Sequence, residues 1–231
     1  MLKVVSFIIV LLSFSYSGFT QAFQIRDLGT LTDQFSYERS RIISIYGVDH
    51  YDIEGTPFLN ESFIIGEVLL NDSVRFVNIP LRYNIYNDRM EFKNEREQIL
   101  ELDIAKDGFV FFVENQVFMM RDYIYDGFDS RGVLELIADG KIHLYKKYRV
   151  EFKPATAPRG FQEAKPNRLV RQRDKFLLSI DGQTPRDFRN RNELITALQS
   201  IDPGIEDYIK DKRLNINSEK DMKRIVERIN N

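Results

Sequence analysis

The chain has 231 residues with no cysteine, and its 33 basic and 35 acidic side chains give a formal net charge of −2. Such an even balance excludes a nucleic-acid-binding protein that works through bulk electrostatic attraction. The lack of cysteine excludes disulfides, a thiolate nucleophile, a Cys-ligated metal and lipid attachment to an N-terminal Cys. The length suffices for one domain with its own hydrophobic core.

Residues 1–22 have the pattern of a secretory signal peptide. Lys3 supplies a positive start, an apolar run follows over residues 4–12, and Ala22 ends the segment with a small residue. The apolar run is shorter than the about 20 residues that a spanning helix needs, although a retained membrane anchor is the alternative. The sequence therefore predicts cleavage before Phe23 and export to the periplasm or cell envelope, or secretion, with no integral membrane segment left.

After a lead-in over residues 23–54, short stretches of alternating apolar and polar residues follow one another up to residue 182. This period of two is typical of strands with one buried face. Four Asp-Gly pairs, at 107–108, 126–127, 139–140 and 181–182, favour hairpin turns. Pro80 inside one strand indicates an edge strand or a bulge. The pattern predicts an antiparallel sheet over residues 55–182. This is either a curled sheet or an open barrel.

The last long ribbon, over residues 142–153, has the clearest alternation. Ile142 and Leu144 face one way and His143 faces the other among lysines, while Lys146 is the one exception on the apolar side. On this pattern we expect His143 to be solvated.

Residues 153–175 differ from the strands before them. Seven basic and two acidic side chains, with three prolines, give this segment a net charge of +5. We expect a long loop here, which is unusual inside a compact domain. It is either a solvated loop that balances an acidic body or a binding site for an anionic partner, such as a phosphorylated lipid or an acidic polysaccharide. The residues of this candidate site are Arg159, Lys165, Arg168, Arg171 and Arg173.

Three short helices are predicted over residues 183–231. Asn192, Asp202-Pro203 and Ser218 are typical helix starts, with Asp221 as the capping-box partner of Ser218. Helices this short are unstable alone, so they must pack on the sheet or on each other. The complete pattern predicts an α+β protein: an antiparallel sheet followed by a small three-helix C-terminal region.

Few residues are candidates for catalysis or metal binding. The chain has two histidines, and His50 lies between carboxylates in Asp49-His50-Tyr51-Asp52. It could act as a general base or ligand, but no nucleophile motif accompanies it. Asp122, Asp126 and Asp129 lack the spacing of a calcium loop and are typical of turns. We therefore predict no metal and no cofactor, and His50 is a weak catalytic candidate.

Two segments resemble an uncharacterised family of exported Bacteroidota proteins. The first is Gly55-Thr56-Pro57-Phe58-Leu59, and the second runs from the strand Leu81-Arg82-Tyr83-Asn84-Ile85-Tyr86 to Met90-Glu91-Phe92. A tail like residues 208–214 leads into the last helix in that family. The resemblance implies the compartment and the fold, and no activity is attached to it.

The sequence leaves three functions open. The leading hypothesis is a non-enzymatic envelope protein that binds another protein, a glycan or a lipid. The alternatives are a hydrolase that uses carboxylates, with His50 as a base, and a carrier of a small apolar ligand inside the Phe-rich sheet. An internal apolar cavity would favour the carrier, a cleft with converging carboxylates the hydrolase, and a filled core with an exposed patch the binding protein.

Overall fold

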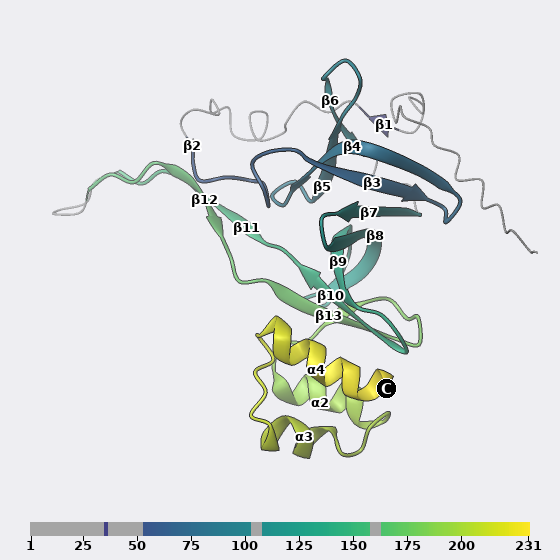
Figure 1. The fold of residues 1–231 in the computed structure, drawn as a ribbon. Coiled ribbons are helices and arrows are strands. Elements are labelled where there is room, and N and C mark those ends of the chain that lie inside the picture. Colours follow the sequence, from purple (N-terminus) through teal and green to yellow (C-terminus); the bar gives the residue numbers. More distant parts are fainter. Residues whose placement is uncertain (1–34, 37–52, 103–107, 158–162) are drawn as a thin grey trace, which may run out of the picture.

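The computed structural model describes residues 53–102, 108–157 and 163–231, and the backbone alone of residues 35–36. The predicted signal peptide, His50 and Arg159 lie outside the described residues. With 48% of residues in strands and 17% in helices, mostly C-terminal, the predicted α+β class is confirmed (Figure 1).

One eleven-stranded sheet forms most of the molecule, in the order β1-β6-β5-β4-β3-β7-β8-β14-β13-β10-β9. Its neighbouring strands are antiparallel except for the parallel pair β14 and β8. Its strands are β1 (Phe35–Ser36), β3 (Ile64–Leu70), β4 (Val74–Asn84), β5 (Arg89–Lys93), β6 (Ile99–Leu102), β7 (Phe109–Val113), β8 (Gln116–Tyr125), β9 (Phe128–Ala138), β10 (Ile142–Lys147), β13 (Lys175–Ile180) and β14 (Arg186–Asp187).

The end of this sheet closes into a barrel of five strands, because β8 pairs with β9 as well as with β14. Residues that alternate along these strands fill the interior: Tyr123, Leu134, Tyr145 and Leu177 are buried against one another. The other half of the sheet covers a separate core rich in phenylalanine, with Phe76, Phe92 and Phe111 fully buried. The possibility of a barrel that the alternating pattern raised is therefore realised by five of the strands.

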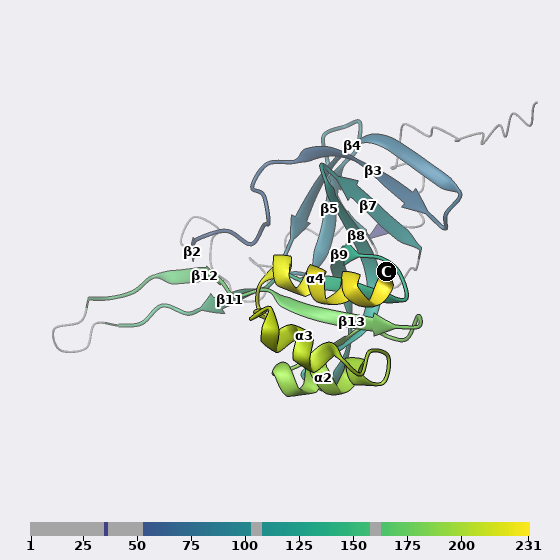
Figure 2. The same cartoon turned by 60° about the horizontal axis from the view of Figure 1, so that its bottom comes forward.

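The three predicted helices are confirmed as α2 (Arg191–Gln199), α3 (Ile205–Asp211) and α4 (Glu219–Asn230). They pack on the outer face of the barrel, where Ile142 and Leu144 of β10 share a core with Ile225 of α4 (Figure 2). The helices therefore complete the sheet and share its core. None of the helices in the described parts of the chain is long and apolar enough to cross a membrane.

The helix starts agree only in part with the sequence. Asn190, and not Asn192, caps α2, since its side chain accepts a hydrogen bond from the Glu193 N–H at 3.0 Å. Ser218 caps α4 as predicted, through the Asp221 N–H at 3.4 Å. The Asn192 prediction was two residues late, because the buried stripe alone does not fix the first turn.

The described residues of the basic segment 153–175 are largely paired as a ribbon and do not form a loop, which corrects the prediction for them. They extend a hairpin of β11 (Val150–Lys153) and β12 (Asn167–Arg171), and β12 also pairs in parallel with β2 (Ile53–Glu54). Reciprocal backbone hydrogen bonds between Thr156 and Lys165, 2.9 and 3.0 Å long, continue the ribbon. We call residues 150–157 and 163–171 the arm, which projects from the body (Figure 1). The prolines had suggested irregular structure, but strands β11 and β12 and the Thr156–Lys165 pair satisfy backbone groups on either side of Pro154 and Pro166.

Pro80 lies neither at an edge nor in a bulge, but close to one. It is in β4, between β3 and β5, and pairs in register with Ile65, while the register of β3 and β4 shifts between Gly66 and Val68. Asn78 nearby has a φ of +58°, as an irregular strand requires. The Asp126-Gly127 turn has positive φ at both positions, +50° and +86°, which confirms a hairpin turn.

Candidate functional site

A cleft of about 550 Å³ opens at one mouth of the small barrel. It exists because β8 pairs with β7 as far as Met119 and with β14 only at Ile124, so one edge of β8 over residues 120–123 has no partner strand among the described residues. Eleven residues line this barrel-mouth cleft: Gly108, Met120, Arg121, Asp122, His143, Tyr145, Ser179, Gly182, Gln183, Thr184 and Pro185. Its volume lies within the range of about 300–1,000 Å³ that is usual for ligand sites.

Arg121 is the cation at this open edge. It alternates with Met119 and Tyr123, which pack into the barrel interior, so its side chain leaves β8 on the interior side. The adjacent Asp122 leaves on the other side and pairs with Arg131 at 2.7 Å. No carboxylate in the described parts of the chain pairs with Arg121, whose guanidinium lies 3.9 Å from Met119 Sδ.

His143 lies in the wall of the barrel-mouth cleft, which corrects the expectation that it is solvated. Its side chain is 29% exposed, and its Nε2 lies 2.8 Å from Asp139 Oδ1. The ring stacks on Tyr145, with centroids 6.1 Å apart. Its Nδ1 is buried and has no hydrogen-bond partner. When the neutral ring donates its Nε2–H to Asp139, Nδ1 is an acceptor without a donor.

Tyr145 and Ser179 complete the polar floor of the cleft. Burial raises the pKa of the Tyr145 hydroxyl, and the positive charge of Arg121 opposes that rise. Ser179 lies directly opposite His143 on the neighbouring strand, but its hydroxyl donates to the Gln183 carbonyl. Since His143 Nδ1 has no partner, no hydrogen bond joins the serine to the histidine. The nucleophile–base pair of a serine hydrolase is therefore not formed here.

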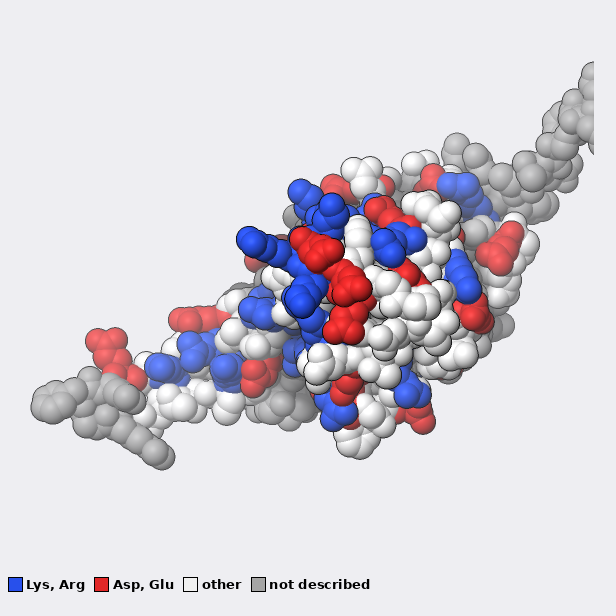
Figure 3. All heavy atoms as spheres, turned by 90° about the horizontal axis from the view of Figure 1, so that it is seen from below, with Lys and Arg blue, Asp and Glu red and all other residues white. Residues whose placement is uncertain are grey.

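The arm does not gather its basic residues into one site. Arg171 pairs with Asp174 at 2.6 Å, and Arg168 lies between Lys153 on β11 and Glu54 on β2. Lys153 is in turn 3.8 Å from Glu151. Side chains of both signs occur along the arm (Figure 3). Neighbouring carboxylates thus offset much of the charge that the sequence suggested. The two remaining predicted residues, Lys165 and Arg173, are exposed.

The motif that carries the family resemblance forms a packed cluster. The guanidinium of Arg82 lies between the rings of Phe58 and Phe63, 3.7 and 4.3 Å from their centroids. It pairs at 2.6 Å with Glu91, which is buried and accepts a second hydrogen bond, at 3.0 Å, from Asn84. Both carboxylate oxygens of Glu91 are therefore engaged. The motif residues stabilise the sheet, and this carboxylate is not available for acid–base chemistry.

Asp88, in the turn between β4 and β5, links the two halves of the sheet. One of its oxygens accepts from Tyr83 at 2.6 Å and from the Val133 N–H at 3.2 Å. The other accepts from Lys147 at 2.8 Å and from Tyr123 at 3.3 Å. Four donors satisfy this carboxylate, so we interpret it as structural. No sequence signal could have found it, because its partners come from four strands.

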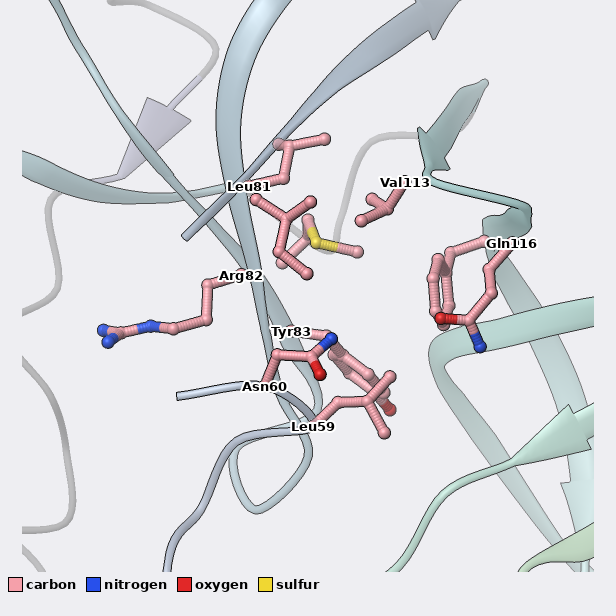
Figure 4. A pocket seen from close by; sticks show the side chains of 10 residues that line it. Leu59, Asn60, Leu81, Arg82, Tyr83, Val113 and Gln116 are labelled. Carbon is pink, nitrogen blue, oxygen red and sulfur yellow. The ribbon is translucent and has the colours of Figure 1, made fainter. Parts of the chain in front are cut away.

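The apolar recess between β3, β4 and β7 is too small for a carried ligand. Leu59, Leu81 and Val113 are among the residues around it, while Arg82 points away (Figure 4). Its volume of about 10 Å³ is room for a single water at most. The Phe-rich core is filled here by its own side chains.

Comparison of the chain with protein-family models, with curated proteins and with solved structures found no match. The site is therefore defined by its own geometry: a small barrel with a packed interior and a polar cleft at one mouth, whose wall contains a half-satisfied histidine and an arginine that no carboxylate of the described residues pairs with. Among the described residues, no group of three or more acidic or histidine side chains is placed to hold a metal ion. Sequence reasoning missed Arg121, Tyr145 and Ser179.

Proposed function

We propose that the chain is an exported, non-enzymatic binding protein whose barrel-mouth cleft binds a small polar ligand. The observation that carries this proposal is the cleft itself, whose volume of about 550 Å³ is usual for a ligand site and whose lining includes the polar side chains of Arg121, Ser179 and Gln183. Arg121 is exposed and pairs with no carboxylate among the described residues, so its guanidinium is available to a polar ligand.

Three features support binding over the alternative functions. The Ser179 hydroxyl donates to the Gln183 carbonyl and not to His143, so these two residues do not form an activated nucleophile. The buried Glu91 pairs with Arg82 and accepts a hydrogen bond from Asn84, which argues against a hydrolase built on this carboxylate. The recess of Figure 4 is almost filled and gives no support to the carrier function.

Titration of residues 23–231, labelled with ¹⁵N, tests the cleft directly. The probes are D-glucose, D-glucuronate, glycine, L-lactate and inorganic phosphate, each followed through backbone amide shifts. We expect at least one probe to shift the amides of residues 120–122, 143, 179 and 182–184, and to be recovered unchanged. Shifts confined to the arm, or chemical conversion of a probe, would contradict the proposal.

A matched pair of variants separates binding from folding. Arg121→Gln removes the positive charge of the cleft at an exposed position, so we expect unchanged thermal stability together with weaker binding. Lys141→Ala, at an exposed position before β10, is the control and should change neither. An Arg121→Gln protein that binds as well as wild type would refute the role of this side chain.

Export is tested separately by mass. The segment 1–22 has the signal-peptide pattern, so protein recovered from the periplasm of an expressing bacterium should have the mass of a chain that begins near Phe23. A mass that still includes residues 1–22 would show that the segment is retained.

A further inference from the structure

The strand that closes the barrel is held to β8 by few contacts. β14 has two residues, and the residue of β8 in register with it is Ile124. The Ile124 N–H donates to the carbonyl of Pro185, just before β14, at 2.8 Å. In the turn after β8, the Asp126 N–H donates to Asp187 Oδ1 at 3.1 Å. We call these contacts between β8 and β14 the junction. Both residues of β14 also pair with β13, so opening of the junction would leave β14 attached there.

One oxygen of Asp187 is satisfied in the junction and the other is not. Oδ1 accepts the Asp126 N–H, whereas Oδ2 is buried and has no hydrogen-bond partner. A buried oxygen without a donor costs far more free energy in an ionised carboxylate than in the neutral acid. Once β14 leaves β8, water can hydrate both oxygens. The ionised form of Asp187 therefore favours opening of the junction, and the protonated form favours closure.

The charges around Asp187 act in both directions. Asp126, in the turn after β8, disfavours the ionised form, while Lys175, on β13, favours it. The hydroxyl of Tyr125 and the exposed guanidinium of Arg189 are also close enough to interact electrostatically with the carboxyl. Burial is the largest effect, and it raises the pKa of Asp187 in the closed junction above its ordinary value. The stability of the junction is therefore complete below the ordinary carboxyl pKa of about 4, and it is lost as the pH rises through the raised pKa.

We propose that β14 is a pH-dependent latch on the barrel-mouth cleft: protonation of Asp187 fastens the strand to β8, and ionisation releases it. Gln183, Thr184 and Pro185 line the cleft and lead directly into β14. Release of the strand therefore frees this wall of the cleft, and acid holds the wall in place. The latch goes beyond the proposed function, and its test requires no ligand.

Amide hydrogen exchange of the ¹⁵N-labelled protein measures opening of the junction. The reporter is the Ile124 N–H, which exchanges when its hydrogen bond to Pro185 opens. We expect its protection factor, corrected for the intrinsic pH dependence of exchange, to fall between about pH 4 and about pH 7. The fall is about tenfold for each unit by which closure raises the carboxyl pKa. The amides of β10, a strand that is paired on both sides, should be better protected than Ile124 at every pH.

Two variants assign the effect to its residue. Asp187→Asn has the shape of the protonated acid and no charge, so the Ile124 N–H should keep its acid protection factor at every pH. Asp129→Asn removes an exposed carboxylate next to the same turn and should behave like wild type. The ¹³C shift of the Asp187 carboxyl gives its pKa in wild type without any variant. We expect a titration midpoint above that of an ordinary aspartate.

Four results would overturn the latch. The first is an Ile124 protection factor that does not depend on pH, and the second is an Asp187→Asn protein that loses protection as wild type does. The third is an Asp187 carboxyl that titrates at or below the ordinary value. The fourth is equal protection of Ile124 and the β10 amides, since the junction would then open only with the whole barrel. None of these measurements includes a ligand, so failure of the latch leaves the proposed function standing, and a cleft that binds no probe leaves the latch standing.

Discussion

Replacing Lys146 by Met should destabilise the fold far more than loss of a surface charge does. The lysine side chain is 9% exposed, and its Nζ lies 2.6 Å from Glu135 and 2.8 Å from Glu219. Glu135 on β9 is as buried as the lysine, whereas Glu219 begins α4 and is half exposed. Methionine keeps the packing of the aliphatic stem and removes only the charge. The variant therefore leaves Glu135 as a buried carboxylate without its cation.

The magnitude follows from what remains around Glu135. Loss of one partner of a buried ion pair costs about 3–5 kcal/mol. Glu135 keeps hydrogen bonds from Tyr148 at 2.6 Å and from Gln116 at 2.9 Å, which place the loss at the lower end. We expect about 3 kcal/mol, which corresponds to a fall in Tm of about 6–12 °C for a chain of this size.

Urea denaturation, monitored by circular dichroism, measures this loss of stability. Glu219→Gln is the matched control, because it removes the exposed partner of the same lysine and should cost less than about 1 kcal/mol. The double variant Lys146→Met/Glu135→Leu should recover most of the stability, since an apolar pair of similar volume can replace a buried ion pair. If Lys146→Met costs no more than Glu219→Gln, the pairing of Lys146 with Glu135 does not stabilise the fold.

Two further predictions concern the packing of α4 and the response to alkali. Ile225→Ala should lower the free energy of unfolding by about 2–5 kcal/mol, because Ile225 is fully buried against the barrel. Lys223→Ala, at an exposed position, should change it by about 0.5 kcal/mol or less in the same urea denaturation experiment. Equal effects would mean that α4 is undocked. Burial raises the pKa of Tyr83 and Tyr148, and the carboxylate partners of Lys146 raise its pKa, so the folded state holds these protons more tightly than the unfolded state. The stability that these three protonated groups contribute is complete below about pH 10 and is lost as the pH rises further. Tyrosinate absorbance should therefore appear together with loss of circular dichroism. Smooth ionisation of the tyrosines near pH 10 without unfolding would contradict this prediction.

Local alternation predicted the strands but could not identify what each face contacts. In β10 the apolar residues Ile142 and Leu144 face the helices, as expected. His143 and Tyr145, on the other face, contact the barrel interior and its mouth, so polar alternation did not mean solvent. Lys146 was the exception on the apolar face, and such an exception is a usable sign of a buried ion pair.

Pairings between segments far apart in the chain could not be predicted from the sequence. The arm depends on β12 meeting both β11 and β2, and β2 is more than a hundred residues earlier in the chain. Closure of the barrel depends on β14, a strand of two residues with no periodicity of its own. Local propensity carries no information on either contact. The prediction of a loop over residues 153–175 was wrong for its described residues for this reason.

The same two-residue strand explains why the cleft lies where it does. A barrel of so few strands has an interior just wide enough for side chains, and here Tyr123, Leu134, Tyr145 and Leu177 occupy it. A ligand site can therefore form only where the wall is incomplete. Because β14 pairs with β8 at Ile124 alone, the wall stops short of Arg121 and leaves its guanidinium accessible at the mouth. A longer β14 would have paired the free edge of β8 and closed the cleft, so the short strand is the structural condition for the cleft.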